Sequence, residues 1–184
     1  MRPGVNALRI PVYPAMIDIV KGAEVEFSNY KFDKDLIRAT FENYVFTNGR
    51  PITKSMLAWW AYHDVNQTLI SHGTTLEIEH IYPKKRQENE CGLSEKGNLE
   101  SLGNKALLEK GINIRASDYR FADKKKYYIG YTKSKGIAKD GTKISELQTI
   151  AKDYTDYTEQ NVIDRKNKIL DEFIKYLEDM GLID

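Results

Sequence analysis

TTLEIEHI, residues 74–81, is the stretch of the sequence that decides the fold. Its β-branched start and its alternation of apolar and polar side chains predict a strand, which Pro83 ends. A second short apolar run, residues 102–108, follows a Gly-Asn turn, and residues 109–117 suit a short helix. The sequence therefore predicts two strands and a short helix near the middle of the chain.

Helical patterns surround this centre. Residues 15–20 are apolar, residues 32–46 repeat apolar side chains at helical spacing, and Thr53 is expected to cap a helix that ends before Gly73. Residues 145–154 and 158–180 are expected to form closing helices. The polar residues 84–101 are expected to form a loop, and the basic residues 127–143 a loop or ribbon.

These patterns together predict an α+β fold in three segments. Residues 1–73 form a helical support region, and residues 74–143 form the core with its basic segment. Residues 144–184 supply C-terminal closing helices packed on the same domain.

Charge is distributed unevenly along the chain. Residues 1–83 carry 8 Lys/Arg against 9 Asp/Glu, or −1, and residues 84–143 carry 15 against 8, or +7. Residues 144–184 carry 5 against 10, or −5. A basic middle segment is a candidate surface for nucleic acid, although a solvated lysine-rich surface would give the same count.

The composition excludes several classes of protein. Cys91 is the only cysteine, so an internal disulfide and every Cys-based zinc cluster are excluded. A reducing, cytoplasmic setting is the expectation that follows. No segment approaches the ~18 consecutive apolar residues that a membrane span needs, and the first residues lack the features of a secretory signal.

The residues best suited to chemistry lie in and just after the first predicted strand. Hydrolysis of a phosphodiester needs a deprotonated water and a cation on the phosphate oxygens. Histidine is a suitable base near neutral pH, and Mg²⁺ can be held by one carboxylate and one amide oxygen. Because neighbouring side chains on a strand point to opposite sides, Glu79 and His80 would divide this work. Each residue alone has an ordinary structural explanation, so only their combination is specific.

The combination resembles a known family. Glu-His-Ile-x-Pro, a polar loop, Gly-Asn and an Asn nine residues later is similar to the pattern of HNH (ββα-metal) nucleases. The fuller run, LEIEHIYPK…LGNKALLEKGINIRASDYRFADKKKYY, resembles the C-terminal HNH domain of GmrSD-like modification-dependent (type IV) restriction proteins. The similarity continues upstream into ITKSMLAWWAYHD and downstream into YTEQNVIDRKNKILDEFIKYL. It implies a ββα-metal core embedded in a mainly helical domain.

The resemblance implies a role for each matching residue. His80 would be the general base, and Asn104 would orient it. Glu79 and Asn113 would hold one divalent ion, Mg²⁺ or Mn²⁺, with Asn113 in a position where the family motif ends in His. Pro83 and Gly103 match structural positions. The residues of the basic segment expected to contact DNA are Lys105, Arg115, Lys124 and Lys125, with Lys124 nearest the cleaved phosphate.

The implied function is a metal-dependent DNA endonuclease that acts in restriction or defence against foreign or modified DNA. Two departures from the family pattern stand out. Glu79 replaces the usual Asp, and nothing here resembles the ParB-like nucleotide-binding domain with which GmrSD-like proteins usually begin. The chain is therefore expected to be a C-terminal fragment or to act with a partner. A catalytically weak HNH-fold DNA-binding or assembly module, and a helical structural protein with a chance motif, remain open as alternatives.

Overall fold

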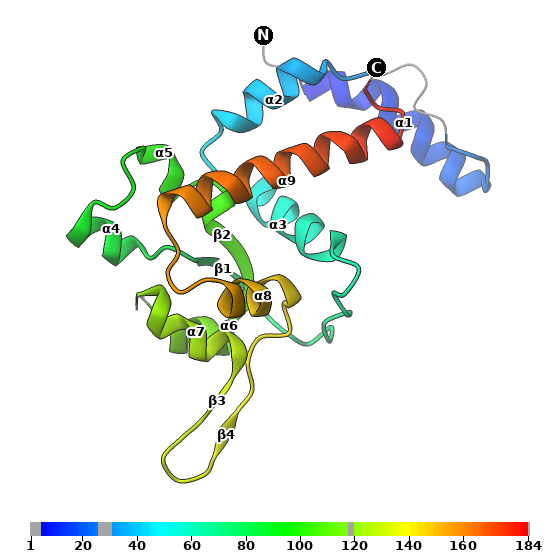
Figure 1. Ribbon diagram of the computed structural model, residues 1–184. Coiled ribbons are helices and arrows are strands. Elements are labelled where there is room, and N and C mark those ends of the chain that lie inside the picture. The colour runs from blue at the N-terminus through cyan, green and yellow to red at the C-terminus, as the bar shows by residue number, and fades with distance from the viewer. Residues whose placement is uncertain (1–4, 26–30, 118–119, 184) are drawn as a thin grey trace. The chain divides into compact units, whose positions relative to one another are not determined.

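The computed structural model describes residues 5–25, 31–117 and 120–183 (Figure 1). Its contacts divide the chain into two compact units, a terminal unit of residues 1–43 and 170–184 and a central unit of residues 44–169. Helix α9 (Glu159–Asp179) contributes its first part to the central unit and its last part to the terminal unit. This division differs from the three expected segments, because α3 (Pro51–His63) lies in the same unit as the strands.

The terminal unit contains α1 (Val5–Lys21), α2 (Lys34–Glu42) and the end of α9. Helix α2 begins after Asp33, whose carboxylate accepts a hydrogen bond from the Leu36 amide at 2.9 Å, as an N-cap residue does. The predicted helix of residues 32–46 is therefore shorter at both ends. The core of the unit is an apolar cluster to which α9 and the C-terminal residues contribute Leu170, Ile174, Leu177 and Ile183.

The central unit contains both sheets and the remaining helices. Its elements after α3 are β1 (Leu76–His80), α4 (Lys84–Glu90), α5 (Lys96–Leu99), the 3-10 turn η1 (Leu102–Asn104), β2 (Lys105–Glu109), α6 (Lys110–Ala116), α7 (Phe121–Ile129), β3 (Tyr131–Thr132), β4 (Ala138–Lys139) and α8 (Ser145–Asp153).

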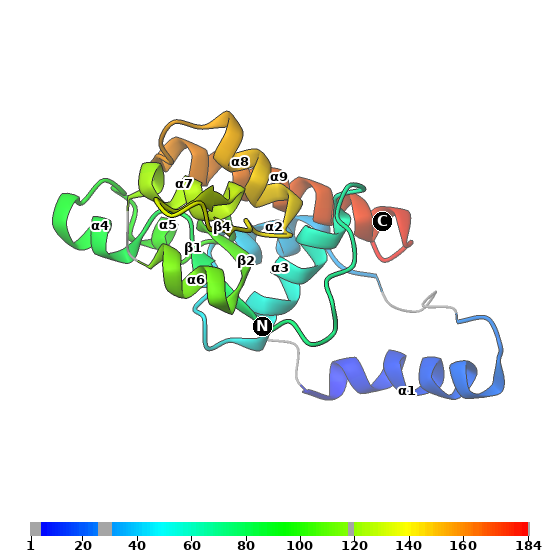
Figure 2. The same cartoon turned by 90° about the horizontal axis from the view of Figure 1, so that it is seen from below.

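Strands β1 and β2 form an antiparallel pair in which Glu79 lies opposite Ala106 and His80 opposite Lys105. Helix α6 follows β2 directly and packs against both strands, while α7 packs against α6 and α8 (Figure 2). Helix α3 packs against β2. The predictions of two strands, a short helix after them and an α+β chain are confirmed.

A buried arginine and a close backbone approach fix the start of β2 against α9. Arg165 donates to the carbonyl oxygens of Leu102 and Lys105 at 2.6 and 2.7 Å, and its charge is paired with Glu146 at 2.7 Å. A Cβ atom added at Gly103 would lie 1.9 Å from the Val162 carbonyl oxygen, so only glycine fits between η1 and α9. The end of the 3-10 turn is thereby held in one position.

Two local predictions were wrong. Residues 84–101 contain α4 and α5 instead of a continuous loop. Thr53 does not cap α3, because Arg50 occupies the N-cap position and the Thr53 hydroxyl donates to the Thr47 carbonyl at 2.8 Å. The basic residues 127–143 form the last turn of α7 and then the β3–β4 hairpin, so the expected ribbon is confirmed over only part of this range.

Candidate functional site

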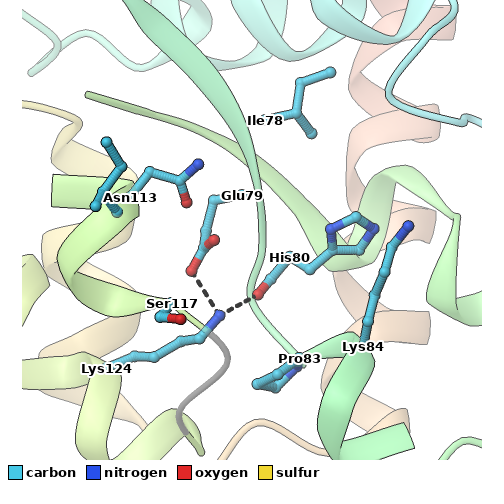
Figure 3. Close-up of a pocket in the computed structure, with 9 residues that line it drawn as sticks. Ile78, Glu79, His80, Pro83, Lys84, Asn113, Ser117 and Lys124 are labelled. Atoms are coloured by element: carbon cyan, nitrogen blue, oxygen red, sulfur yellow. Dashed lines mark hydrogen bonds and ion pairs between the residues drawn. The ribbon is translucent and has the colours of Figure 1, made fainter. Parts of the chain in front are cut away.

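A pocket of about 240 Å³ opens beside β1, α6 and α7 (Figure 3). Its walls include Glu79 and His80 from β1, Asn113 from α6 and Lys124 from α7, with Pro83 at the start of α4. The antiparallel pairing of β1 with β2 brings α6 back beside β1, and the packing of α7 on α6 adds Lys124. Residues predicted separately from the sequence therefore line one pocket.

Glu79 is a buried carboxylate with a positive partner. Its side chain is 5% exposed, and its Oε1 atom accepts hydrogen bonds from Lys124 Nζ at 2.7 Å and from the Tyr128 hydroxyl at 2.6 Å. Lys124 Nζ also donates to the His80 carbonyl oxygen at 2.7 Å. Burial and the charge of Glu79 raise the pKa of Tyr128 well above its usual value, so the hydroxyl stays protonated and donates.

Asn113 is oriented by a second carboxylate on β1. Its Nδ2 atom donates to Glu77 Oε2 at 2.9 Å, and Glu77 lies two residues before Glu79 on the same face of the strand. With the amide nitrogen held by Glu77, the amide oxygen lies on the side of Glu79 (Figure 3). Within the described part of the chain, Glu79 Oε2 and Asn113 Oδ1 accept no hydrogen bond. These two oxygen atoms are therefore available as ligands for a metal ion.

His80 is buried beside an acidic residue on the other side of β1 from Glu79 (Figure 3). Its Nε2 atom lies 3.5 Å from Glu100 Oε1 and makes no hydrogen bond among the described residues. Burial, together with the positive charge of Lys105, lowers the pKa of His80 to about 4, although the negative charge of Glu100 opposes both effects. The imidazole is therefore neutral at physiological pH and can accept a proton.

Glu100 is held in place by two lysines. Lys105 Nζ lies 2.6 Å from Glu100 Oε2, and Lys84 Nζ lies 3.0 Å from Oε1. The Lys105 ammonium also donates to Asn48 Oδ1 at 2.6 Å. A chain of polar contacts thus runs from Asn48 through Lys105 to the carboxylate that faces His80.

Asn104 fixes the chain that follows His80. It is fully buried, its Oδ1 accepts from the Tyr82 amide at 2.7 Å, and its Nδ2 donates to the carbonyls of Tyr82 and Leu99 at 3.1 and 3.0 Å. Its own carbonyl accepts from the Ile81 amide at 2.9 Å. Asn104 therefore acts on His80 through the backbone between β1 and α4.

The expected DNA contacts lie in different environments. Lys105 has no exposed surface and is held by Glu100 and Asn48, so its expected role as a DNA contact does not fit this placement. Lys124 lines the pocket, but its ammonium is bound to Glu79 and the His80 carbonyl. Lys125 donates to the Tyr154 carbonyl at 2.6 Å, and Arg115 is half-buried.

Sequence reasoning missed Glu77, Glu100 and Tyr128. Glu77 carried a signal, because it alternates with Glu79 along a predicted strand and therefore shares its face. Glu100 and Tyr128 carried none, since their contacts with His80 and Glu79 depend on tertiary packing. Among the described residues there is no group of three or more His, Cys, Asp and Glu side chains that could enclose a metal, and none of the helices is long and apolar enough to cross a membrane.

Comparison with known proteins agrees with the motif. A family model described as the C-terminal domain of GmrSD restriction endonucleases matches residues 26–172, which confirms the resemblance stated from the sequence. No curated protein and no solved structure gives a match. The matched range contains the whole pocket.

Proposed function

This chain belongs to the family of C-terminal domains of GmrSD restriction endonucleases, and we propose that it cleaves DNA as an HNH endonuclease with a ββα-metal core. The family implies nuclease activity. One observation supports the finer assignment: Glu79 and His80 of β1 and Asn113 of α6 line a single pocket, and α6 is the helix that follows β2, the antiparallel partner of β1. By the same resemblance, the biological role is restriction of foreign or modified DNA.

His80 is the general base of the proposed reaction. The neutral imidazole accepts a proton from the water that attacks the phosphorus atom. Glu100, 3.5 Å from Nε2, favours the tautomer that carries its proton on that atom, so that Nδ1 is left to accept. A bound DNA phosphate raises the pKa of His80, because a nearby anion stabilises the imidazolium. Asn104 keeps the backbone next to His80 fixed during this step.

The donors in the pocket fit a hard divalent ion that keeps several of its waters. Glu79 Oε2 and Asn113 Oδ1 would hold the ion, and Glu77 would keep the Asn113 oxygen turned toward it. Bound Mg²⁺ or Mn²⁺ would stabilise the charge that develops on the phosphate and the departing oxygen. Lys124 neutralises Glu79 before an ion binds, which keeps the buried carboxylate in place.

A second function is favoured by one specific contact. Lys124 Nζ lies 2.7 Å from Glu79, so the ammonium competes with a divalent ion for the same carboxylate. If the ammonium prevails, the domain is a DNA-binding or assembly module that cleaves little by itself and acts with a partner domain.

Nicking of supercoiled plasmid tests both functions. We expect the full chain to nick plasmid in Mg²⁺ or Mn²⁺ and to stop in EDTA. Asn113→Ala should reduce nicking strongly, whereas Asn167→Ala, at an exposed asparagine of α9, should leave it unchanged. DNA binding with no nicking in either metal would support the binding module instead, and nicking that persists in EDTA would contradict the metal-dependent mechanism.

The metal ligands can be tested directly in crystals. After a Mn²⁺ soak at neutral pH, we expect an anomalous peak with oxygen atoms of Glu79 and Asn113 within about 2.0–2.6 Å. The absence of a peak between these two side chains would contradict the assignment of the ligands.

A further inference from the structure

The β3–β4 hairpin is a narrow ribbon that projects from the central unit (Figure 1). Tyr131 lies opposite Lys139 and Thr132 opposite Ala138. Beyond these pairs, the Lys133 amide donates to the Ile137 carbonyl at 2.9 Å, and the turn closes through Gly136 at a φ of 75°. Isolated two-stranded hairpins are marginal in water, so the shape of this ribbon depends on how its base is held.

The base of the ribbon is held rigidly. Gly130 has a φ of 89°, and a Cβ atom added at Gly141 would lie 2.3 Å from the Tyr128 carbonyl oxygen, so the two ends of the hairpin pack at a distance only glycine allows. The buried Thr142 donates from its amide to the Tyr128 carbonyl at 2.9 Å and from its hydroxyl to Glu109 at 2.5 Å. These contacts with α7 and with the end of β2 fix the direction in which the ribbon projects.

One face of the ribbon combines lysines with aromatic and aliphatic side chains. Residues opposite each other in an antiparallel pair share a face, so Tyr131 and Lys139 lie on the same side as Lys133 and Ile137. Ile137 is 54% exposed, and Lys133 and its turn neighbour Lys135 are exposed. The face continues onto α7, where the Tyr127 ring meets the Tyr131 ring edge-on at 5.3 Å and Lys126 Nζ lies 5.1 Å from the Tyr127 ring centre.

This ribbon therefore carries lysines of the basic segment that are exposed, in contrast to the buried lysines beside the pocket. Lys105 and Lys124 are buried and paired, so they add nothing to the surface potential available to a ligand. In the described structure, Lys133, Lys135 and Lys139 have no carboxylate within ion-pair distance. Three unpaired ammonium groups on a projecting two-stranded ribbon, next to aromatic rings, suit a polyanion with stacked bases.

We propose that the β3–β4 ribbon is a second DNA-binding element, which contacts the duplex outside the pocket and positions it for cleavage. The choice of DNA as the polyanion rests on the proposed function. A two-stranded ribbon fits the major groove, and its lysines contact the flanking phosphates. The chain from Lys124 to Lys135 first follows α7 to its end at Ile129, rising about 1.5 Å per residue, and then runs through six extended residues at about 3.3 Å each. Lys135 therefore lies at most about 27 Å from Lys124. At about 3.4 Å per base pair, the contact lies within about eight base pairs of the cleaved phosphate.

Salt-dependent binding to a 30-base-pair duplex tests the ribbon. The full chain is measured in Ca²⁺, which is expected to support binding better than cleavage, beside a Lys133→Gln/Lys135→Gln/Lys139→Gln variant. The matched control, Lys152→Gln/Lys168→Gln/Lys175→Gln, removes the same charge from exposed positions outside the basic segment. We expect the ribbon variant to flatten the slope of log K against log salt by about two to three units, since each phosphate contact contributes about 0.9, and the control to change it by less than about one.

The outcomes separate the ribbon from the nuclease. Equal slopes for the ribbon variant and the control would overturn the proposed role of the ribbon in DNA binding, whether or not the wild type nicks plasmid. If duplex binding depends on the ribbon but the wild type never nicks plasmid, the DNA-binding role of the ribbon is supported and the proposed nuclease activity is contradicted. A greater loss on single-stranded DNA or RNA than on duplex, or no duplex binding by the wild type, would overturn the assignment to duplex DNA.

Discussion

The buried ion pair between Lys124 and Glu79 gives the sharpest test of the geometry of the pocket. Lys124→Met removes the ammonium but keeps most of the volume of the side chain. Glu79 is then left buried with the Tyr128 hydroxyl as its one remaining hydrogen-bond donor in the described structure. Breaking a buried pair by removing one partner costs about 3–5 kcal/mol, because the other charge stays desolvated.

This cost converts into a large change in melting temperature. For a unit the size of residues 44–169, 1 kcal/mol shifts the Tm by about 3–5 °C, so Lys124→Met should melt about 9–25 °C below the wild type. Lys126→Met, at an exposed position two residues along the same helix, should change the free energy of unfolding by less than about 0.5 kcal/mol. The double variant Lys124→Met/Glu79→Gln should recover most of the loss, since it leaves no unpaired charge.

Denaturant and thermal unfolding followed by circular dichroism measure these differences. Added Mg²⁺ should raise the Tm of Lys124→Met more than that of the wild type, because the ion supplies the missing positive charge and binds the folded state. If Lys124→Met lowers the free energy of unfolding no more than Lys126→Met does, the buried ion pair is refuted. Failure of the double variant to recover stability would refute the explanation by an unpaired carboxylate.

Two further predictions concern residues around the pocket. Asn104→Ala removes three hydrogen bonds at a fully buried position and leaves the Tyr82 amide unpaired, so unfolding by urea should show a loss of about 3 kcal/mol. The second concerns Glu159, whose pKa is lowered to about 2 by hydrogen bonds from the Ser94 hydroxyl, the Glu95 amide and Asn98. Its stabilisation is fully present above about pH 4.5 and is lost as the pH falls toward 2, so Glu159→Gln should show a smaller fall in unfolding free energy than the wild type between pH 5 and pH 3.

The strands and the helix of the core could be predicted because their signal is local. Alternation along residues 74–81 and the apolar run after the turn report burial of one face, and β1, β2 and α6 follow these patterns closely. Helix α4 could not be predicted in this way, since KKRQENE has no apolar periodicity. It is held by distant contacts: Arg86 pairs with Asp156 through two hydrogen bonds of 2.6 and 2.7 Å.

The lysines show why the site was only partly predictable. A charge count treats every lysine as surface, yet Lys105 and Lys124 are buried because carboxylates from other elements, Glu100 and Glu79, neutralise them. The motif located Glu79, His80 and Asn113 at the pocket because their spacing reflects strand–strand–helix connectivity. It could not locate Glu100, whose approach to His80 depends on packing alone.

The cleavage rate of His80→Ala tests the central claim most directly. Single-turnover cleavage of a labelled duplex in Mg²⁺ is measured for the wild type, for His80→Ala and for His72→Ala, which changes an exposed histidine outside the pocket. We predict that His80→Ala lowers the rate about 10²–10⁴-fold, as expected for loss of a positioned base, while duplex affinity and unfolding free energy change little. His72→Ala should cleave at the wild-type rate. A highly purified His80→Ala protein that also cleaves at the wild-type rate would contradict His80 as the general base.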